Sequence, residues 1–405
     1  MKNYDAYCNE SWEEWQNEKT NVNILVLGNT GSGKSSLINK NYGNINVATV
    51  NDCSRGTEDF NTYNGKDYGS KINFIDSMGY EIGQGEQGKK EIIFIDKIKS
   101  YISEQNSKGA GINAVWYCVS VSIPHMEPID LDVIESLSKY DEIKGRICVV
   151  LTKCDVEEAG FPICTKFTQL IKERCPGIQI FRTSTKPQFE DYMQFEELSE
   201  WTENCFTTED QKLAFERTQN VSLSQKKSHM YKEIAGFTAA AAAIGAIPIP
   251  ISDALALTAL QVTMAQRIMF YYGLPSKMNA IKEIVGNTFV SQIGKMAAGS
   301  IIKLIPGVGT ILGATVNAGV ASTITVAMGL TISNVCYDAC QKIAKGENVN
   351  WDNLFNIDFI KPLFESFLKN KDEIKKVEAY KTDENVTNAG KIYAENIKDE
   401  TDEDI

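Results

Sequence analysis

Short apolar runs alternate with longer charged segments along the first half of the chain. The first run, residues 22–27, is rich in Val, Ile and Leu and ends at a glycine, which is typical of a buried parallel strand; a helix is expected to begin at Lys34. Residues 59–76 have the pattern of a hairpin, in which Asn64-Gly65 supplies the positive φ angles of a tight turn. Further strands are expected at 114–121, 146–152 and 178–183, with helices near 86–105, 130–140 and 166–174. This alternation predicts an α/β domain whose mainly parallel six-stranded sheet is covered by helices on both faces.

The pattern changes in the second half of the chain. Residues 206–232 are charged and polar and are expected to form a connecting helix. Residues 234–252 and 304–335 carry no charged side chain and are rich in Ala, Gly and Ile. Each of these two stretches contains an Ile-Pro break between helix-like segments, which indicates two related helical hairpins.

Local signals mark the ends of some of these helices. Ser252-Asp253 is a good start for a helix that runs to Tyr272, and Gly273 is a good stop. The tail after Lys369 is charged and poor in large apolar residues, so loose helix or disorder is expected there. The predicted organisation is an N-terminal helical segment (1–20), the α/β domain (21–205), a helical connector (206–232), an all-α helical domain (233–369) and a charged tail (370–405).

Composition narrows the classes of function. A chain of 405 residues suits two domains, each large enough to bury its own core. The net charge of −12 argues against a nucleic-acid partner, which needs surplus Lys and Arg on one face. Ten Cys without a CxxC pair and only two His leave little from which to build a zinc site. The polar, acidic first 20 residues lack the pattern of a signal peptide, so reduced thiols in the cytoplasm are expected.

The segment between the first strand and its helix carries the clearest chemistry. Residues 28–35 read Gly-Asn-Thr-Gly-Ser-Gly-Lys-Ser and fit GxxxxGK[ST], the pattern of a loop that cradles phosphates with its backbone N–H groups. Lys34 is expected to neutralise the β- and γ-phosphates, and Ser35 to ligate Mg²⁺. The alternative is a glycine-rich turn without a ligand. The residues expected to contact the nucleotide here are Gly28, Asn29, Thr30, Gly31, Ser32, Gly33, Lys34, Ser35 and Ser36.

Two later segments are candidates for sensing the γ-phosphate. Asp76-Ser-Met-Gly79 follows an expected strand, so Asp76 would hold Mg²⁺ through water and the Gly79 amide would contact the γ-phosphate. Thr57 is expected to ligate Mg²⁺ only in the triphosphate state, with Thr49 as the rival for that role. The expected metal ligands are therefore Ser35, Thr57 and Asp76.

A third element indicates which base is bound. Residues 152–155, Thr-Lys-Cys-Asp, follow an apolar strand and match [NT]KxD. The carboxylate of Asp155 can accept two hydrogen bonds from the guanine ring N–H and amino group, whereas adenine offers no such pair. Thr152 belongs to the same element, and Lys153 would pack its stem along the base. Thr183 and Ser184, at the end of the next strand, would complete the base pocket through backbone contacts.

Taken in order, these motifs resemble those of the translation-factor-related GTPases, closest to the Era-like and immunity-related branches. The resemblance covers roughly the first half of the chain and implies a Ras-like P-loop G domain that binds GTP and GDP with Mg²⁺ and hydrolyses GTP slowly. In that family the matching catalytic positions are Lys34, Thr57 and Gly79. The segments around Asp253 and Gly309 resemble a helical domain of unknown function found on Era-like GTPases of bacteria and protists, which implies proximity to a membrane.

One residue departs from the pattern of the wider superfamily. After DxxG many members carry a Gln that orients the attacking water, but Tyr80 stands there in this chain. Hydrolysis is therefore expected to be slow without help. The help could come from a partner, from self-association across the nucleotide face, or from another side chain such as Glu81, and no arginine finger is assigned.

The helical half raises the question of a membrane. Residues 304–335 are long enough to cross the hydrocarbon core, which needs about 20 residues, and 234–252 are borderline. Their richness in Ala, Gly, Thr and Ser lowers the gain from insertion, so a packed soluble bundle is the alternative to an embedded hairpin within 234–336. The favoured hypothesis is a GTP-dependent switch at the cytosolic face of a membrane or in a homo-oligomer. The rivals are a GTP-binding scaffold with negligible hydrolysis and, less favoured, an ATPase.

Overall fold

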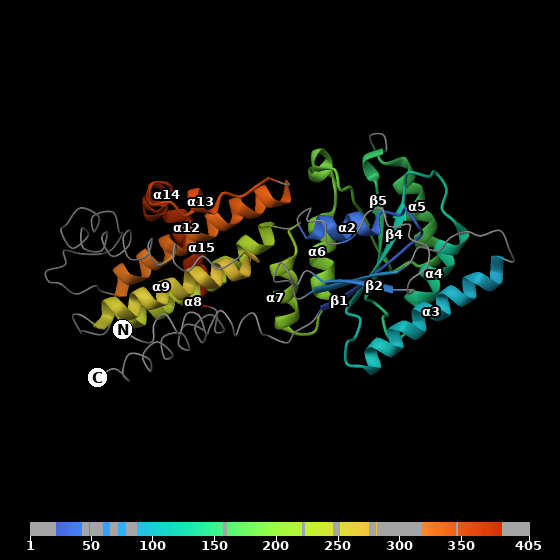
Figure 1. Ribbon diagram of the computed structural model, residues 1–405, viewed down its shortest axis with the longest axis horizontal. Helices are drawn as coiled ribbons and strands as arrows, with labels where there is room; N and C mark the ends of the chain where they lie inside the picture. Colours follow the sequence, from blue (N-terminus) through green and yellow to red (C-terminus); the bar gives the residue numbers. More distant parts are fainter. Residues whose placement is uncertain are drawn as a thin grey trace. The chain divides into compact units, whose positions relative to one another are not determined.

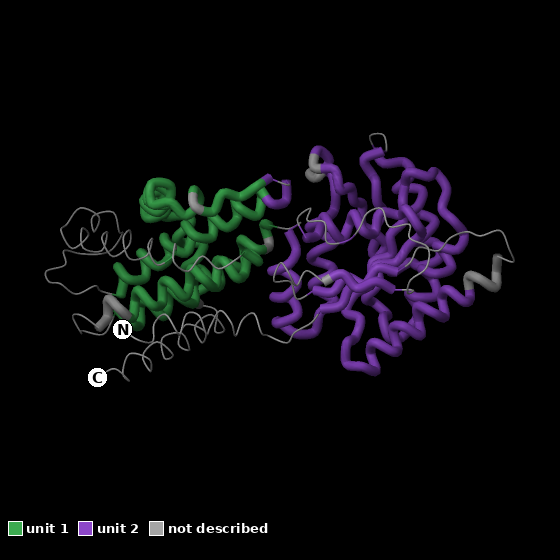
Figure 2. The backbone as a smooth tube through the Cα atoms, in the orientation of Figure 1, with its two compact units in different colours: residues 1–18, 223–342, 348–405 green, residues 19–222, 343–347 purple. Residues whose placement is uncertain are grey.

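The computed structural model describes residues 22–42, 48, 60–64, 72–77, 87–156, 160–220, 223–245, 252–274, 281, 318–345 and 347–382. The predictions for the N-terminal segment 1–20, for both Ile-Pro breaks and for residues 383–405 lie outside this part of the chain. The chain divides into two compact units, one formed by residues 19–222 and 343–347 and the other by residues 1–18, 223–342 and 348–405 (Figure 2). Each unit is described by itself below.

The first unit contains a six-stranded sheet with the order β2-β3-β1-β4-β5-β6 (Figure 1). Four of the five strand pairs are parallel, and β2 pairs antiparallel with β3. The predicted mainly parallel sheet is therefore confirmed. The strands are β1 (Val22–Leu27), β2 (Phe60–Asn64), β3 (Ile72–Ser77), β4 (Ala114–Ser120), β5 (Ile147–Thr152) and β6 (Gln179–Arg182).

Helices cover both faces of this sheet, as the alternation of strands and helices predicted (Figure 1). Helices α3, α4 and α5 lie on one face, and α2, α6 and α7 lie on the other. Every residue of β1 and of β5 is buried, which is why these strands are mostly apolar in the sequence, with Asn23 and Thr152 as the polar exceptions. The helices are α2 (Lys34–Asn41), α3 (Gln87–Ser107), α4 (Pro128–Ser138), α5 (Pro162–Arg174), α6 (Phe195–Asn204) and α7 (Glu209–Thr218).

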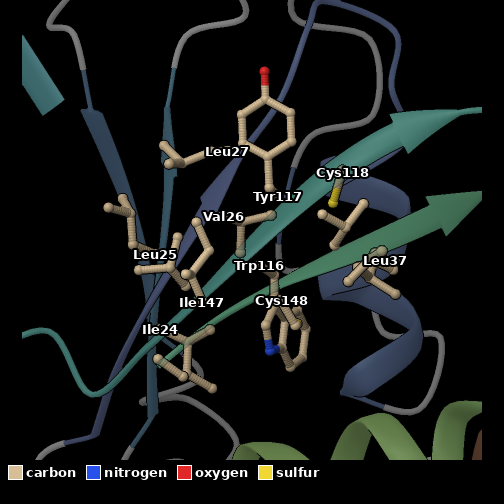
Figure 3. Packing of buried hydrophobic residues seen from close by; sticks show 14 of the residues in the cluster. Ile24, Leu25, Val26, Leu27, Leu37, Trp116, Tyr117, Cys118, Ile147 and Cys148 are labelled. Atoms are coloured by element: carbon tan, nitrogen blue, oxygen red, sulfur yellow. The ribbon is translucent and has the colours of Figure 1, made fainter. Parts of the chain in front are cut away.

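Strand β4 supplies large side chains to both halves of the core (Figure 3). Trp116 and Tyr117 are fully buried and point to opposite sides of the strand, as successive residues of a strand do. The Trp116 indole N–H donates a hydrogen bond to Thr202 Oγ1 at 3.0 Å, and its ring packs against Phe74 with 5.3 Å between ring centres. Because Thr202 belongs to α6, this hydrogen bond fixes the helix against the sheet and satisfies a polar group that burial would otherwise leave unpaired.

The segment predicted to be one connecting helix forms two helices. Helix α7 ends at Thr218 and belongs to the sheet unit, whereas α8 (Leu223–Gly245) belongs to the helical unit. The reason is that Phe206 and Phe215 are apolar within an otherwise polar stretch. Both are buried in the core of the sheet unit, where their rings pack edge to face with 5.4 Å between centres.

The second unit is helical, and its longest helices are α8, α9 (Ser252–Tyr271) and α12 (Ala318–Ala344). Small residues let α8 and α12 approach closely: a Cβ added to Gly329 would lie 2.8 Å from side-chain carbons of Ile234. Gly273 follows α9 with a φ of 71°, which confirms the predicted stop. The unit is completed by α13 (Trp351–Leu354), α14 (Ile357–Lys369), α15 (Lys371–Glu378) and the 3₁₀ turn η6 (Ala379–Thr382).

The beginning of the charged tail is more ordered than the sequence indicated. Loose helix or disorder was expected after Lys369, but α15 buries Ile374 and Val377, and Tyr231 of α8 donates a hydrogen bond to Glu373 Oε2 at 2.7 Å. Two apolar residues three positions apart provide one buried face, which the overall charge of the tail concealed.

Helix α12 bears on the membrane question. Within the part of the chain that the structure describes, it is the one helix that is long and apolar enough to cross a membrane. Most of its apolar stretch is buried inside the helical unit, which is also what the core helix of a soluble bundle looks like.

Candidate functional site

The loop between β1 and α2 adopts a backbone that requires its glycines. Gly28, Gly31 and Gly33 have φ angles of 136°, 77° and 90°, a region that other residues rarely adopt. A Cβ at Gly28 would lie 2.2 Å from the carbonyl oxygen of Cys118, so no side chain fits there. The two glycines of GxxxxGK[ST], Gly28 and Gly33, are thus demanded by the shape of the loop, which leads directly into the N-terminus of α2.

Lys34 is buried under this loop. Its Nζ donates hydrogen bonds to the carbonyl oxygens of Gly28 at 3.1 Å and Asn29 at 3.2 Å, and it lies 3.9 Å from Oδ1 of Asp76. A buried ammonium is stable only when it is paired and hydrogen-bonded. The site therefore holds a positive charge at the centre of the loop, where a phosphate would sit.

Ser35 and Asp76 form the polar pair expected to hold a metal ion. Ser35 Oγ donates a hydrogen bond to Asp76 Oδ2 at 3.2 Å, whereas Asp76 Oδ1 is buried and finds no hydrogen-bond donor among the described residues. Burial raises the pKa of Asp76 to about 6, although Lys34 and the Ser35 hydrogen bond act in the opposite direction. A hydroxyl beside a carboxylate oxygen that lacks a donor fits Mg²⁺, which prefers oxygen ligands.

The segment after β5 is tied to the phosphate loop by side chains. Thr152 Oγ1 donates to the Ser32 carbonyl oxygen at 2.5 Å, and Lys153 Nζ donates to the Gly31 carbonyl oxygen at 2.7 Å. Lys153 has a φ of 59°, an uncommon conformation for a residue with a side chain. These contacts hold the expected base-reading segment at a fixed position beside the phosphate loop.

Asp155 is paired through both of its carboxylate oxygens. Ser184 Oγ donates to Oδ1 at 2.6 Å, and Lys186 Nζ lies 2.5 Å from Oδ2. Burial alone would raise the pKa of Asp155, but the hydrogen bonds from Lys186 and Ser184 outweigh it and hold the pKa below its usual value. The Asp155 side chain is only 5% exposed, whereas that of Lys186 is 57% exposed. The site thus presents an ionised carboxylate next to a cation that has room to move away.

The structure brings Thr183 and Ser184 next to Asp155, and their role in the base pocket stays a prediction. The backbone N–H of Cys154 donates to the Thr183 carbonyl oxygen at 3.1 Å, which joins the loops after β5 and β6. Ser184 contacts Asp155 through its side-chain hydroxyl. Sequence reasoning missed Lys186. Its place two residues after Ser184, in the loop at the same edge of the sheet, is the signal that could have found it.

A second group of residues that the sequence did not reveal supports the phosphate loop. Asp130, in the first turn of α4, accepts a hydrogen bond from the Tyr117 hydroxyl at 2.7 Å. The Asn29 side-chain amide lies 3.1 and 3.2 Å from the two oxygens of the same carboxylate. Burial raises the pKa of Asp130 to about 6, partly offset by the Tyr117 hydrogen bond, and burial with the nearby Asp130 raises that of Tyr117 well above its usual value. The second residue of the loop is therefore anchored to both β4 and α4.

The remaining predicted residues divide into two groups. Ser36 lies in the first turn of α2, and Thr30 lies on the exposed side of the loop, so both belong to the same edge of the sheet as the residues above. Thr57 and Gly79, together with Thr49, Tyr80 and Glu81, lie outside the described residues, and their roles remain predictions.

Known proteins are similar to parts of this chain. Residues 23–153 match the family model described as 50S ribosome-binding GTPase. Magnetosome membrane protein 22 of Magnetospirillum gryphiswaldense is 32% identical over 100 residues, which are 24% of this chain and 51% of the relative; the chain thus spans about half the length of this curated protein.

Two solved structures are weakly similar to this chain. Toc33 from Arabidopsis thaliana is 20% identical with a TM-score of 0.32, over 45% of this chain and 80% of that one. The bacterial dynamin GTPase LeoA from ETEC is 12% identical with a TM-score of 0.32, over 98% of this chain and 90% of that one. The family match over residues 23–153 and the six-stranded sheet together show the fold of a P-loop GTPase domain.

Proposed function

We propose that this protein binds GTP and GDP, hydrolyses GTP slowly, and uses the difference between the two states as a switch. The observation that carries guanine recognition is the ionised carboxylate of Asp155 held beside the phosphate loop. Guanine offers two N–H donors to one carboxylate. Adenine offers none in that geometry, so it would gain no hydrogen bond from Asp155, and displacement of Lys186 by adenine would cost about 1–3 kcal/mol or more for a charged group.

The phosphate side of the site supports the same proposal. The backbone N–H groups of residues 28–36 and the ammonium of Lys34 would hold the β- and γ-phosphates, with Lys34 exchanging its contacts to the loop carbonyls for phosphate oxygens. Ser35 and Asp76 would hold Mg²⁺, joined in the triphosphate state by Thr57. When bound, this ion neutralises charge that develops on the phosphate oxygens.

The slow rate of hydrolysis rests on the sequence. Tyr80 occupies the place of a water-orienting Gln, and a phenol cannot align water in the same way. Gly79 would contact the γ-phosphate through its amide, and Thr57 would close over it. The second candidate function, a GTP-binding scaffold with negligible hydrolysis, is favoured by the same Tyr80.

We further propose that the helical unit couples this switch to a membrane at its cytosolic face or to a second copy of the chain. Support comes from the apolar helix α12 and from the name of the relative, magnetosome membrane protein 22. We also propose that the chain belongs to the Era-like or immunity-related branch of these GTPases. Because the net charge is −12, nucleic acid is not among the proposed partners.

Calorimetry with the full chain tests nucleotide binding. The wild type should bind GDP and GTP with Mg²⁺ and should not bind ATP at the same concentration. Lys34→Ala should lose binding, whereas Lys139→Ala, which removes an exposed lysine from an i,i+4 pair with Glu135, should bind like the wild type. Binding of ATP and GTP with equal affinity would contradict guanine recognition.

A single-turnover assay then separates the two functions. Release of phosphate from bound GTP, lost in Lys34→Ala, supports the switch. Retention of intact GTP over hours supports the scaffold.

Carbonate extraction of membranes from expressing cells tests the attachment to a membrane. Full release of the intact chain into the supernatant would contradict insertion.

A further inference from the structure

Two buried cysteines meet beneath the base-reading segment. Cys154 is the third residue of the Thr-Lys-Cys-Asp motif and begins the short 3₁₀ turn η2 (Cys154–Val156), whereas Cys164 lies in the first turn of α5. Both are reduced and buried, and their sulfurs are 3.4 Å apart. The Cys154 thiol also lies 3.3 Å from the Leu151 carbonyl oxygen, to which it donates, so the Cys154 sulfur is left to accept from the Cys164 thiol.

We propose that Cys154 and Cys164 are a modification site that closes into a reversible disulfide, and that closure lowers the affinity of the domain for guanine nucleotide. The first part stands on the thiol geometry alone. The second part rests on the function proposed above.

The geometry requires little movement. A disulfide has a sulfur–sulfur distance of about 2.05 Å, so the two atoms must approach by roughly 1.4 Å. The two thiols come from separate elements, η2 and α5, which can shift relative to each other. By contrast, Cys336 and Cys340 are four residues apart on the same helix, where Cβ atoms lie about 5–6 Å apart. That separation exceeds the roughly 3.5–4.5 Å that a disulfide needs, so this pair is an internal control.

The site is also close to solvent. Val156, two residues after Cys154, is 54% exposed, so the chain reaches the surface at that point. On the other side, Pro162 and Thr165 are exposed on either side of Cys164. A local opening of this surface segment would therefore admit a small oxidant, without unfolding of the sheet.

The reaction balances with a low-molecular-weight disulfide, such as oxidised glutathione, as the oxidant. The thiolate of one cysteine attacks a sulfur of the oxidant, forms a mixed disulfide and releases one small thiol. The second cysteine then attacks the protein-side sulfur, breaks the mixed disulfide and releases a second small thiol. The two protons lost by the protein thiols end on these two products, so the protein pair loses two electrons and the oxidant gains them. The second step is fast because the second thiol is already in contact.

Closure would act on the nucleotide through the residues on either side of Cys154. Lys153 donates to the Gly31 carbonyl oxygen at 2.7 Å, and Asp155 accepts from Ser184 at 2.6 Å. The backbone N–H of Cys154 itself donates to the Thr183 carbonyl oxygen. Hydrogen bonds of this length weaken steeply when the atoms move by about 1 Å. Pulling the Cys154 sulfur toward α5 therefore moves the base-reading carboxylate away from its partners.

Peptide mapping of the full wild-type chain tests the bond. The protein is incubated with oxidised glutathione, quenched in acid, alkylated, digested without reductant and analysed by mass spectrometry. The expected product is a cross-linked peptide that joins Cys154 to Cys164 and disappears on treatment with dithiothreitol. In Cys154→Ala the remaining Cys164 should stop at the glutathione adduct, while Cys336→Ala should still form the cross-link. Alkylation of both Cys154 and Cys164 after prolonged oxidation of the wild type would overturn the proposal.

Nucleotide binding to the oxidised and reduced wild type tests the consequence. The affinity for a fluorescent GDP analogue should fall roughly tenfold on oxidation, within the range usual for coupling between two sites. Treatment with dithiothreitol should restore the affinity of the oxidised wild type, and Cys336→Ala should lose affinity on oxidation as the wild type does. A cross-linked protein with unchanged affinity would overturn the regulatory part. Absence of guanine nucleotide binding in both redox states would overturn the proposed function and the regulatory part together, while the mapping still decides whether the bond forms.

Discussion

The ammonium of Lys186 lies 2.5 Å from Oδ2 of Asp155, on a carboxylate whose other oxygen already accepts a hydrogen bond from Ser184. Both acceptor positions that a guanine base would use are therefore occupied by groups of the protein itself. Lys186 is exposed and long, so it is the group that can leave. Until a base arrives, it keeps the carboxylate ionised and oriented.

We expect Lys186→Met to accelerate the association of GDP, because the base no longer has to displace an ion pair. Exposed ion pairs are worth about 0.2–1 kcal/mol, which corresponds to a rate up to roughly fivefold higher. Stopped-flow mixing with a fluorescent GDP analogue measures this, and the rate for the wild type should rise with salt more than that for the variant. Lys144→Met, which changes an exposed lysine in the turn before β5, serves as the control. Equal rates for wild type and Lys186→Met would show that the ion pair does not compete with the base.

Asp155→Asn should reverse the preference for the base. An amide in place of the carboxylate presents one acceptor and one donor, which matches a base that carries oxygen where guanine carries its amino group. GTP should bind more weakly and xanthosine triphosphate more tightly than to the wild type. Competition against labelled GDP measures both. An unchanged order of affinities would remove Asp155 from the base pocket.

The parts of this domain that the sequence predicts are those encoded by neighbouring residues. Strand β1 is apolar except for Asn23, and the loop after it needs glycine at 28, 31 and 33 because of its own backbone angles. The pairing of Lys186 with Asp155 was not foreseen, because it depends on how two loops meet at the edge of the sheet. Asn29 and Asp130 are in contact but lie 101 positions apart in the sequence, so no local pattern predicts their hydrogen bond.

The helices at the boundary between the units illustrate the same limit. Phe206 and Phe215 are two aromatic residues in a polar stretch, and only their burial against the sheet reveals that α7 belongs to that unit. In the tail, Ile374 and Val377 form a buried face of two residues, which is too short for a periodic pattern to stand out. When one or two residues determine whether a segment is buried, the average composition of the segment does not reveal it.

Gly28→Ala and Gly31→Ala form a matched pair that tests the phosphate loop. Both positions have positive φ, but a Cβ at Gly28 would lie 2.2 Å from the Cys118 carbonyl oxygen, whereas nothing lies within 4 Å of one at Gly31. Gly31→Ala should cost only the backbone strain, about 1–2 kcal/mol. Gly28→Ala must also displace β1 or β4, so it should lower the melting temperature further and abolish GDP binding. Similar melting temperatures for the two variants would contradict the close approach of Gly28 to β4.

The buried carboxylate of Asp130 should make the stability of the sheet unit depend on pH. Burial raises its pKa to about 6 from a usual value of 3.8, so between these values the folded state holds a proton that the unfolded state has released. Stability linked to this group is therefore present at low pH and is lost as the pH rises through the window from about 4 to 6, by up to roughly 3 kcal/mol. Asp76, with a pKa raised in the same way, adds a slope of the same sign.

Asp130→Asn should remove the part of this pH dependence of stability that comes from Asp130. The Asn side chain can still accept from Tyr117, but one of the two contacts with the Asn29 amide is lost, so the variant should be less stable at pH 4.5. Because it carries no charge to bury, its deficit relative to the wild type should shrink as the pH rises to 7. Urea unfolding followed by the fluorescence of Trp116 and the other tryptophans measures the difference at each pH. Tyr117→Phe is the companion variant: removing the donor raises the pKa of Asp130 further, so the loss of stability should continue to a higher pH than in the wild type. A constant deficit for Asp130→Asn across this range would mean that Asp130 titrates near its usual value and that the hydrogen bonds from Tyr117 and Asn29 compensate fully for its burial.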